Sequence, residues 1–180
     1  MIRLLKKEEY KKYYPEIKSI YRLALNYNEK DAEFLETRIE YSKNNGFNTH
    51  VWIVKLDNKI IGFANGQDFM ETNWWATQLK KDFTKEMKEK FYNKAFELEE
   101  FALLPDYQSK GYGSKLMQNI IDDLNERDIL LGTKKENNDK AINFFEKFNF
   151  EYLLNPFYYE NSYTGSFIIF CYYGNKKLKI

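Results

Sequence analysis

The stretch Phe96–Lys115, with the sequence FELEEFALLPDYQSKGYGSK, decides the fold of this chain. Its first half predicts a strand whose apolar alternation slips at Glu99–Glu100, and such a slip indicates a β-bulge. Pro105 then ends the strand, because proline has no N–H to donate to a neighbouring strand. Gly111 and Gly113 follow, and apolar residues recur at helical spacing after them. The stretch therefore predicts a strand, a glycine loop and the start of a helix.

A glycine loop that runs into a helix is suited to bind phosphate. The first N–H groups of a helix have no partner within it, and they lie at the positive end of the helix dipole. Two common phosphate loops fit poorly. The loop of nucleotide hydrolases ends in Gly-Lys-Ser/Thr, whereas Ser114 and Lys115 stand here in the reverse order. The dinucleotide fingerprint needs a third glycine where this chain has Leu116.

A third kind of loop fits better. The sequence QSKGYG at Gln108–Gly113 resembles the Q/R-x-x-G-x-G/A pyrophosphate loop of the GNAT superfamily of N-acetyltransferases, and Leu103–Tyr107 resembles the strand end V-x-P-x-Y of that family. Downstream, NDKAINFFEKFNF at Asn138–Phe150 is similar to the family segment N-x-x-A-x-x-F-Y-E-K-x-G-F. The two motifs cover the C-terminal half in the family's order. The N-terminal half matches only in the order of its elements.

The resemblance implies one α/β domain over residues 1–180, with a central, mostly antiparallel, twisted sheet flanked by helices. It implies acetyl-CoA as co-substrate, bound where the core strand and the next strand splay apart. The Leu103 backbone N–H would polarise the thioester carbonyl. Asn138 would contact the pantetheine or position the thioester. The residues that would hold the pyrophosphate are Gln108, Ser109, Lys110, Gly111, Tyr112, Gly113 and Ser114.

The implied reaction is transfer of acetyl to a primary amine of a small molecule, by direct attack in a ternary complex. An amine with a pKa near ~10.4 is protonated at neutral pH, so a base must remove a proton. Glu100 is the first choice, three residues before Leu103 on the core strand. Glu97 and Glu99 share the other face of a regular strand, and the bulge leaves that assignment open. Each carboxylate is alternatively a solvent-facing strand charge.

Phe145 stands where the family often has a tyrosine that acts as general acid. This departure keeps an alternative open: a catalytically weak acyl-CoA-binding sensor or scaffold of the same fold. A protein N-terminus or lysine as acceptor is a variant of the enzyme reading. The sequence does not name the acceptor, because one fold hosts many. The oligomeric state is also open, a homodimer included.

Composition and charge exclude other classes of function. The 28 basic and 27 acidic residues give a net charge of +1 and no basic block, so nucleic-acid binding has no electrostatic support. No apolar run approaches the ~20 residues of a membrane span. The N-terminus, MIRLLKKEEYKK, lacks a signal region, so we expect a cytoplasmic protein without a membrane partner. No Cys/His set for a metal is present; Cys171 is expected as a small core residue in an apolar strand and His50 as a surface residue at a strand entrance.

The segment from Thr72 to Phe91 is less expected in this family. Its apolar residues recur four apart on one helical face, which predicts helix packed on the core. Trp74 lies off that face, and it is alternatively a wall of the acceptor pocket.

Apolar periodicity and turn residues predict the remaining elements. A β-hairpin turns at Asp57-Asn58, Pro15 lies in a first helical turn, and Asn149 tolerates a left-handed helix end in place of the family's glycine. The predicted strands are Ile2–Leu5, Val51–Leu56, Lys59–Ala64, Ile129–Leu131, Phe157–Glu160 and Ser166–Tyr173, the last two joined around Asn161 and Gly165. The predicted helices are Pro15–Tyr27, Ala32–Tyr41, one from the glycine loop to about Arg127, and Asp139–Phe148.

Overall fold

A computed structural model describes residues 1–160 and 165–174 of the chain, and the predicted turn at Asn161 lies outside the described residues. The strands are β1 (Ile2–Leu4), β2 (His50–Leu56), β3 (Lys59–Asp68), β4 (Phe96–Leu103), β5 (Ile129–Lys134), β6 (Glu151–Phe157) and β7 (Phe167–Tyr172). The helices are α1 (Tyr10–Leu25), α2 (Glu29–Asn44), α3 (Trp74–Leu79), α4 (Lys85–Phe91), α5 (Tyr112–Leu124) and α6 (Asp139–Lys147), with short 3-10 turns η1 (Lys7–Glu9) and η2 (Pro105–Tyr107).

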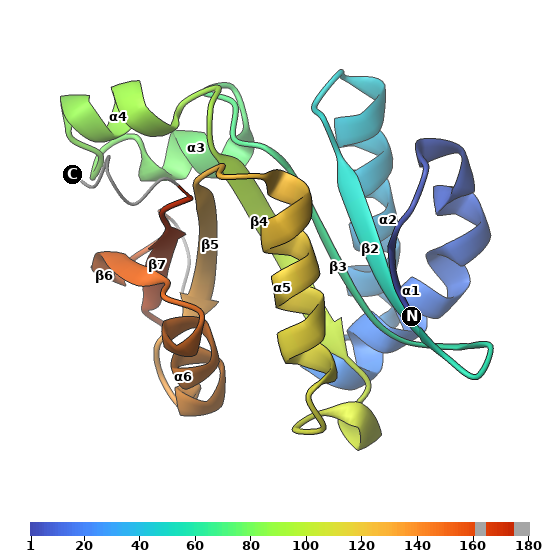
Figure 1. Cartoon of the computed structure of the whole chain (residues 1–180). Coiled ribbons are helices and arrows are strands. Elements are labelled where there is room, and N and C mark those ends of the chain that lie inside the picture. The colour runs from blue at the N-terminus through green and yellow to red at the C-terminus, as the bar shows by residue number, and fades with distance from the viewer. Residues whose placement is uncertain (161–164, 175–180) are drawn as a thin grey trace. The chain divides into compact units, whose positions relative to one another are not determined.

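The strands form one sheet in the order β1-β2-β3-β4-β5-β7-β6 (Figure 1). The pairs β1–β2, β2–β3, β5–β7 and β6–β7 are antiparallel, whereas β4 and β5 are parallel. This arrangement confirms the predicted α/β fold with a mostly antiparallel sheet. The chain folds into two compact units: Met1–Gln67 with Leu98–Asp123, and Asp68–Glu97 with Leu124–Ile180.

The first unit is a sheet covered by helices on both faces (Figure 1). Helices α1 and α2 pack on one face, where Ile17 and Leu35 join Phe63 and Ala102 in a fully buried cluster. Helix α5 covers the other face, and Trp52 of β2 donates its indole N–H to the Asp123 carboxylate over 2.7 Å. One face of this sheet is therefore covered by α1 and α2, and the other by α5. A residue of β3 or β4 contacts one or the other according to the face toward which its side chain points.

The hairpin between β2 and β3 confirms the predicted turn. Asp57 and Asn58 are both left-handed, with φ of 44° and 68°. This pair of conformations is typical of the two-residue type I′ turn, whose twist matches that of the flanking strands. Strand β3, however, runs on to Asp68, whereas the sequence predicted an end at Ala64. Asn65 and Gln67 are thus strand residues.

Helix α1 begins earlier than the sequence predicted. It starts at Tyr10, so Pro15 lies inside the helix rather than in its first turn. A proline there removes one backbone hydrogen bond. Two tyrosines account for the extension: Tyr10 and Tyr14 are almost fully buried, and the Tyr10 hydroxyl donates to the Thr49 carbonyl over 2.8 Å. Burial of both rings outweighs the lost bond. The second predicted helix is confirmed as α2, with longer bounds.

In the second unit, the segment after β3 forms two short helices instead of one. Thr84 begins α4, because its side chain accepts a hydrogen bond from the Met87 N–H. The predicted apolar face still packs inward, since Trp75, Leu79 and Phe83 are buried with the core of this unit. The prediction that helix packs on the core here is confirmed, but the prediction of a single continuous helix was wrong.

The C-terminal hairpin also differs from its prediction. Strand β6 ends at Phe157, where the prediction had it begin, and residues 158–160 are not strand. Pro156 lies within β6, which proline tolerates because β6 is the edge strand of the sheet. The partner strand β7 and the buried position of Cys171 in it are confirmed.

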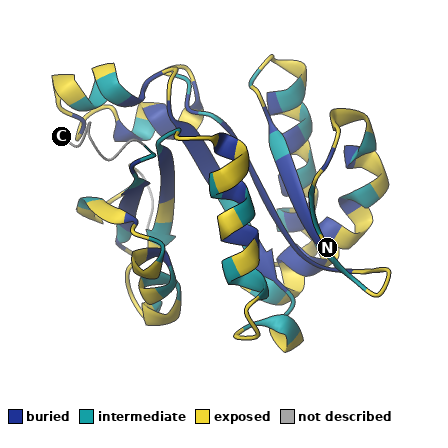
Figure 2. Cartoon of the chain, in the orientation of Figure 1, coloured by how far each residue is buried: buried dark blue, intermediate teal, exposed yellow. Residues whose placement is uncertain are grey.

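The stretch from β4 to α5 follows the sequence closely. Pro105 opens the turn η2 directly after the strand, and α5 begins at Tyr112. Figure 2 shows β4 mostly buried and α5 with one buried stripe, as its apolar spacing predicted. Left-handed Asn125 and Glu126 end α5 short of the expected Arg127. Helix α6 and the left-handed Asn149 after it are confirmed, with φ of 61°.

Helices of the described part of the chain are all too short or too polar to cross a membrane.

Gly62 offers a test of the close approach between β3 and β4. A Cβ on Gly62 would lie 2.9 Å from the Ala102 carbonyl oxygen and from Leu103 Cγ. We expect Gly62→Ala to lower the free energy of unfolding by about 1–3 kcal/mol, because the backbone of β4 must shift. Gly132→Ala is the matched control, since its nearest neighbours are side-chain atoms at 3.3 Å or more that can move. Urea denaturation checks this, and equal losses in both variants would contradict it.

Candidate active site

The glycine loop directs a set of backbone N–H groups outward. Ser109 and Gly111 are left-handed, with φ of 57° and 84°. The Lys115 N–H donates to the Gly111 carbonyl over 3.1 Å and is the first bond of α5. The N–H groups of Tyr112, Gly113 and Ser114 therefore precede the first helical hydrogen bond. Nothing lies within 4 Å of the point where a Gly111 side chain would begin, so this side of the loop is open.

Side-chain and backbone contacts fix this loop to the end of β4. The Gln108 side-chain amide donates to the Leu103 carbonyl over 3.0 Å, and the Leu104 N–H donates to Ile61 over 2.9 Å. Tyr107 and Tyr112 pack edge to face, with Lys110 over the Tyr107 ring at 5.9 Å. The predicted residues from Leu103 to Ser114 thus form one continuous local structure in the first unit.

Two adjacent carboxylates of β4 meet partners on the same face of the sheet. Glu100 accepts from Arg38 Nη2 of α2 over 2.5 Å, and the Tyr21 hydroxyl of α1 lies 3.4 Å away. Glu99 accepts from the side-chain amides of Asn65 over 2.6 Å and Gln67 over 3.2 Å.

Asn65 and Gln67 lie two and four residues after Phe63 on β3, so their side chains point to the same face of the sheet. Phe63 packs against α1 and α2 on that face. Consecutive residues of a regular strand point to opposite faces, so Glu99 and Glu100 depart from regularity. The β-bulge that the sequence predicts at these two residues would account for this arrangement.

The electrostatics of the two carboxyls differ. Burial raises the pKa of Glu99 to about 7, and the charge of Glu100 adds to that rise, while the Arg38 charge opposes it. Burial also raises the pKa of Glu100, and there the direct Arg38 contact favours the charged form. Burial and the Glu100 charge raise the pKa of Tyr21, which therefore stays a neutral donor at ordinary pH. Of the two, Glu99 is the carboxyl whose hydrogen bonds come from neutral groups.

The other predicted site residues lie in the second unit. Glu97 is buried, and Asn73 Nδ2 donates to it over 3.3 Å. Trp74 is 68% exposed, and its ring stacks on Tyr159 at 5.7 Å between centroids. Asn138 precedes α6, and its amide donates to Thr133 Oγ1 over 2.7 Å and to the Lys134 carbonyl over 2.9 Å. That amide ties the end of β5 to the start of α6.

A family model described as the Acetyltransferase (GNAT) family matches residues 8–150. The chain belongs to this family. No curated protein matches the chain in sequence.

Solved structures of the GNAT fold resemble it over nearly their whole length. The ribosomal-protein-S18-alanine N-acetyltransferase of Escherichia coli is 19% identical, with a TM-score of 0.63. The match covers 100% of this chain and 99% of the Escherichia coli chain. An N-acetyltransferase of Staphylococcus aureus is 20% identical, with a TM-score of 0.62 and coverage of 97% and 98%. The PaiA N-acetyltransferase of Thermoplasma acidophilum, solved with coenzyme A, is 16% identical, with a TM-score of 0.56 and coverage of 94% and 97%.

Within this GNAT chain, Phe145 is buried among other aromatic rings. It is 8% exposed and packs edge to face on Phe150, with Phe170 at 5.9 Å between centroids. A phenylalanine is therefore well accommodated at this position of α6, where the family often has a tyrosine.

Sequence reasoning missed four residues of the carboxylate cluster in this GNAT chain: Tyr21, Arg38, Asn65 and Gln67. One signal could have found the last two. Asn65 and Gln67 are polar residues two apart directly after the apolar run Lys59–Ala64, and this spacing places both on one face of a continued strand. Arg38 has no such signal, because its partner Glu100 lies 62 positions away in the chain.

Proposed function

We propose that this chain, acting as a single domain, is an N-acetyltransferase that transfers the acetyl group of acetyl-CoA to a primary amine of a small molecule. Family membership supports acetyl transfer. The complex of the related PaiA N-acetyltransferase with coenzyme A supports the choice of co-substrate. The proposal of an amine as acceptor is supported chiefly by Glu99, a buried carboxyl on the core strand whose pKa is raised to about 7. Such a group accepts a proton near neutral pH.

The pyrophosphate of acetyl-CoA fits the glycine loop in chemistry and in space. The N–H groups of Tyr112, Gly113 and Ser114 are oriented by the start of α5, where the helix dipole favours an anion. The open side of Gly111 leaves room for phosphate oxygens. Gln108, Ser109 and Lys110 complete the proposed loop, and Leu103 and Asn138 keep the roles that the family resemblance implies.

Glu99 suits the role of general base better than Glu100. The direct contact with Arg38 holds one Glu100 oxygen in an ion pair, which lowers its tendency to take up a proton. Glu99 contacts neutral amides, and its raised pKa places it near the operating pH of a base. We therefore replace the sequence-based preference for Glu100 with Glu99, and we assign Glu100 and Arg38 to holding the cluster together.

The proton balance of the proposed reaction is simple. Bound acetyl-CoA supplies an acetyl group activated as a thioester. Glu99 takes one proton from the acceptor ammonium, and the amine nitrogen then forms a bond with the acetyl carbon as the carbon–sulfur bond breaks. The nitrogen gives up its second proton to the departing sulfur or to solvent, which leaves a neutral amide. The sulfur leaves as thiolate, which a thiol with a pKa near ~8.5 tolerates without a strong acid. The phenylalanine at position 145 is therefore compatible with turnover.

Gly113→Val tests the pyrophosphate loop. A branched side chain in the first turn of α5 shields the neighbouring N–H groups, so we expect the Kd for coenzyme A to rise at least about tenfold, or ~1.4 kcal/mol. Gly113 is preferred over Gly111, whose left-handed φ would strain any side chain. Calorimetry measures the affinity, with Gln118→Val on the exposed side of α5 as control. Unchanged affinity in a folded Gly113→Val protein would remove the pyrophosphate assignment.

Glu99→Gln tests the base. In the wild type, kcat/KM should fall as pH drops through about 7, because the Glu99 carboxyl becomes protonated there. We expect Glu99→Gln to lower kcat/KM at pH 7 by ~10²-fold and to approach the wild type at alkaline pH, where the amine deprotonates unaided. Release of the coenzyme A thiol with the most responsive amine of a panel measures this, with exposed Glu8→Gln as control. The same behaviour in Glu100→Gln, but not in Glu99→Gln, would restore Glu100 as base.

A further inference from the structure

The two amides that hold Glu99 leave acceptor atoms unused. Asn65 is fully buried and Gln67 is 6% exposed, and each donates its side-chain NH₂ to the Glu99 carboxyl. The carbonyl oxygens of the same side chains, Asn65 Oδ1 and Gln67 Oε1, are buried without a hydrogen-bond partner among residues 1–160 and 165–174. Buried polar atoms in folded proteins are nearly always satisfied, so each of these oxygens calls for a donor.

The orientation of both amides follows from the chemistry of their partner. An ionised carboxylate only accepts hydrogen bonds, so the NH₂ groups of Asn65 and Gln67 must face Glu99, which leaves the two carbonyl oxygens to accept from another donor. Rotating either amide would bring two acceptors together. The unsatisfied atoms of these two amides are therefore acceptors, and a group that pairs with them is a donor.

We propose that Asn65 Oδ1, Gln67 Oε1 and the Glu99 carboxylate form a seat for the primary ammonium group of the acceptor. A primary ammonium carries three N–H donors, which matches three acceptor groups. The inference rests on the proposed acetyltransferase function, and it adds two β3 residues that recognise the acceptor. It also defines the substrate class as a cation with an unsubstituted NH₃⁺ group.

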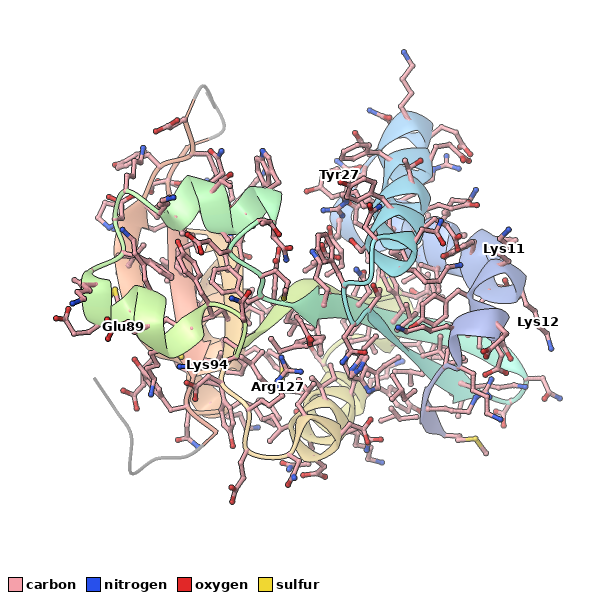
Figure 3. The ribbon with its side chains drawn as sticks, turned by 90° about the horizontal axis from the view of Figure 1, so that it is seen from above. Lys11, Lys12, Tyr27, Glu89, Lys94 and Arg127 are labelled. Atoms are coloured by element: carbon pink, nitrogen blue, oxygen red, sulfur yellow. The ribbon has the colours of Figure 1, made fainter. Side chains whose placement is uncertain are left out.

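Charge around the seat favours a cation. Arg38 and Glu100 form an ion pair, so the Glu99 carboxylate carries the remaining negative charge when it is ionised. Aromatic rings lie on the α1 side of the cluster: Tyr21 packs on Tyr27 at 4.8 Å between centroids, and Figure 3 labels Tyr27 just beyond the end of α1. Ring faces attract an ammonium group.

One edge of the cluster borders solvent. Although protein surrounds the carboxylates, the Arg38 side chain is 32% exposed and that of Glu100 is 15% exposed. Tyr27 at the edge of the cluster is 40% exposed. In the proposed seat, a small amine enters at this edge, past Tyr27 and Arg38.

Binding of benzylamine, compared with uncharged benzyl alcohol of nearly equal shape, tests the seat. Ligand-observed NMR at pH 8 without acetyl-CoA gives the Kd for the wild type, for Gln67→Met and for Asn65→Leu. Each substitution nearly keeps side-chain size and removes one acceptor. We expect benzylamine to bind the wild type at least fivefold more tightly than either variant and than benzyl alcohol. Gln118→Met, the same change on the exposed side of α5, is the control and should match the wild type.

Three results would overturn the seat: no binding of benzylamine to the wild type, equal binding of benzyl alcohol, or benzylamine affinity unchanged in both variants. Coenzyme A affinity shows that each variant is folded, because the glycine loop is not altered. Binding is measured without catalysis, so a protein that seats benzylamine as described but acetylates no amine supports the seat and contradicts the proposed function.

Discussion

The ion pair between Arg38 and Glu100 is the interaction on which the candidate site depends. Two adjacent carboxylates lie on one face of β4, largely out of water, and like charges so placed disfavour each other. Arg38 Nη2, 2.5 Å from Glu100, compensates one of them. The second, Glu99, is left with neutral partners and a pKa of about 7. In the proposed mechanism, this contact separates a carboxylate with a structural role from the one that would exchange protons.

The irregularity of β4 makes this separation possible. In a regular strand, Glu99 would point toward the face that α5 covers, and only Glu100 would face α1 and α2. Both carboxylates instead find partners on the same face, where Asn65 and Gln67 donate to Glu99 and Arg38 donates to Glu100. The same strand continues to Leu103, whose carbonyl holds Gln108 at the start of the glycine loop. One strand therefore carries both the proposed base and the support of the proposed phosphate site.

Features set by local chemistry could be predicted from the sequence. Pro105 ends β4, Asp57 and Asn58 form the hairpin, and the left-handed Asn149 follows α6, because each depends on the backbone preferences of one or two residues. Features set by distant packing could not. The start of α1 depends on the burial of Tyr10 and Tyr14, which outweighs the cost of an internal proline.

The same distinction holds at the candidate site. The sequence identified Glu97, Glu99 and Glu100 as a group but could not rank them, because their partners lie on α2, β3 and the segment that begins α3. Asn65 was missed because the predicted strand ended one residue earlier. The slip in alternation at Glu99–Glu100 was the one local sign of the arrangement.

A direct titration of Glu99 tests the central claim. Protein labelled with ¹³C at the glutamate side-chain carboxyl shows each carboxyl by NMR, and the Glu99→Gln spectrum identifies the Glu99 signal by its loss. We expect this signal to titrate with a pKa of about 7. In Arg38→Gln it should titrate at higher pH, because the opposing positive charge is gone. A Glu99 pKa near the ordinary glutamate value of ~4.3 in the folded wild type would contradict the account.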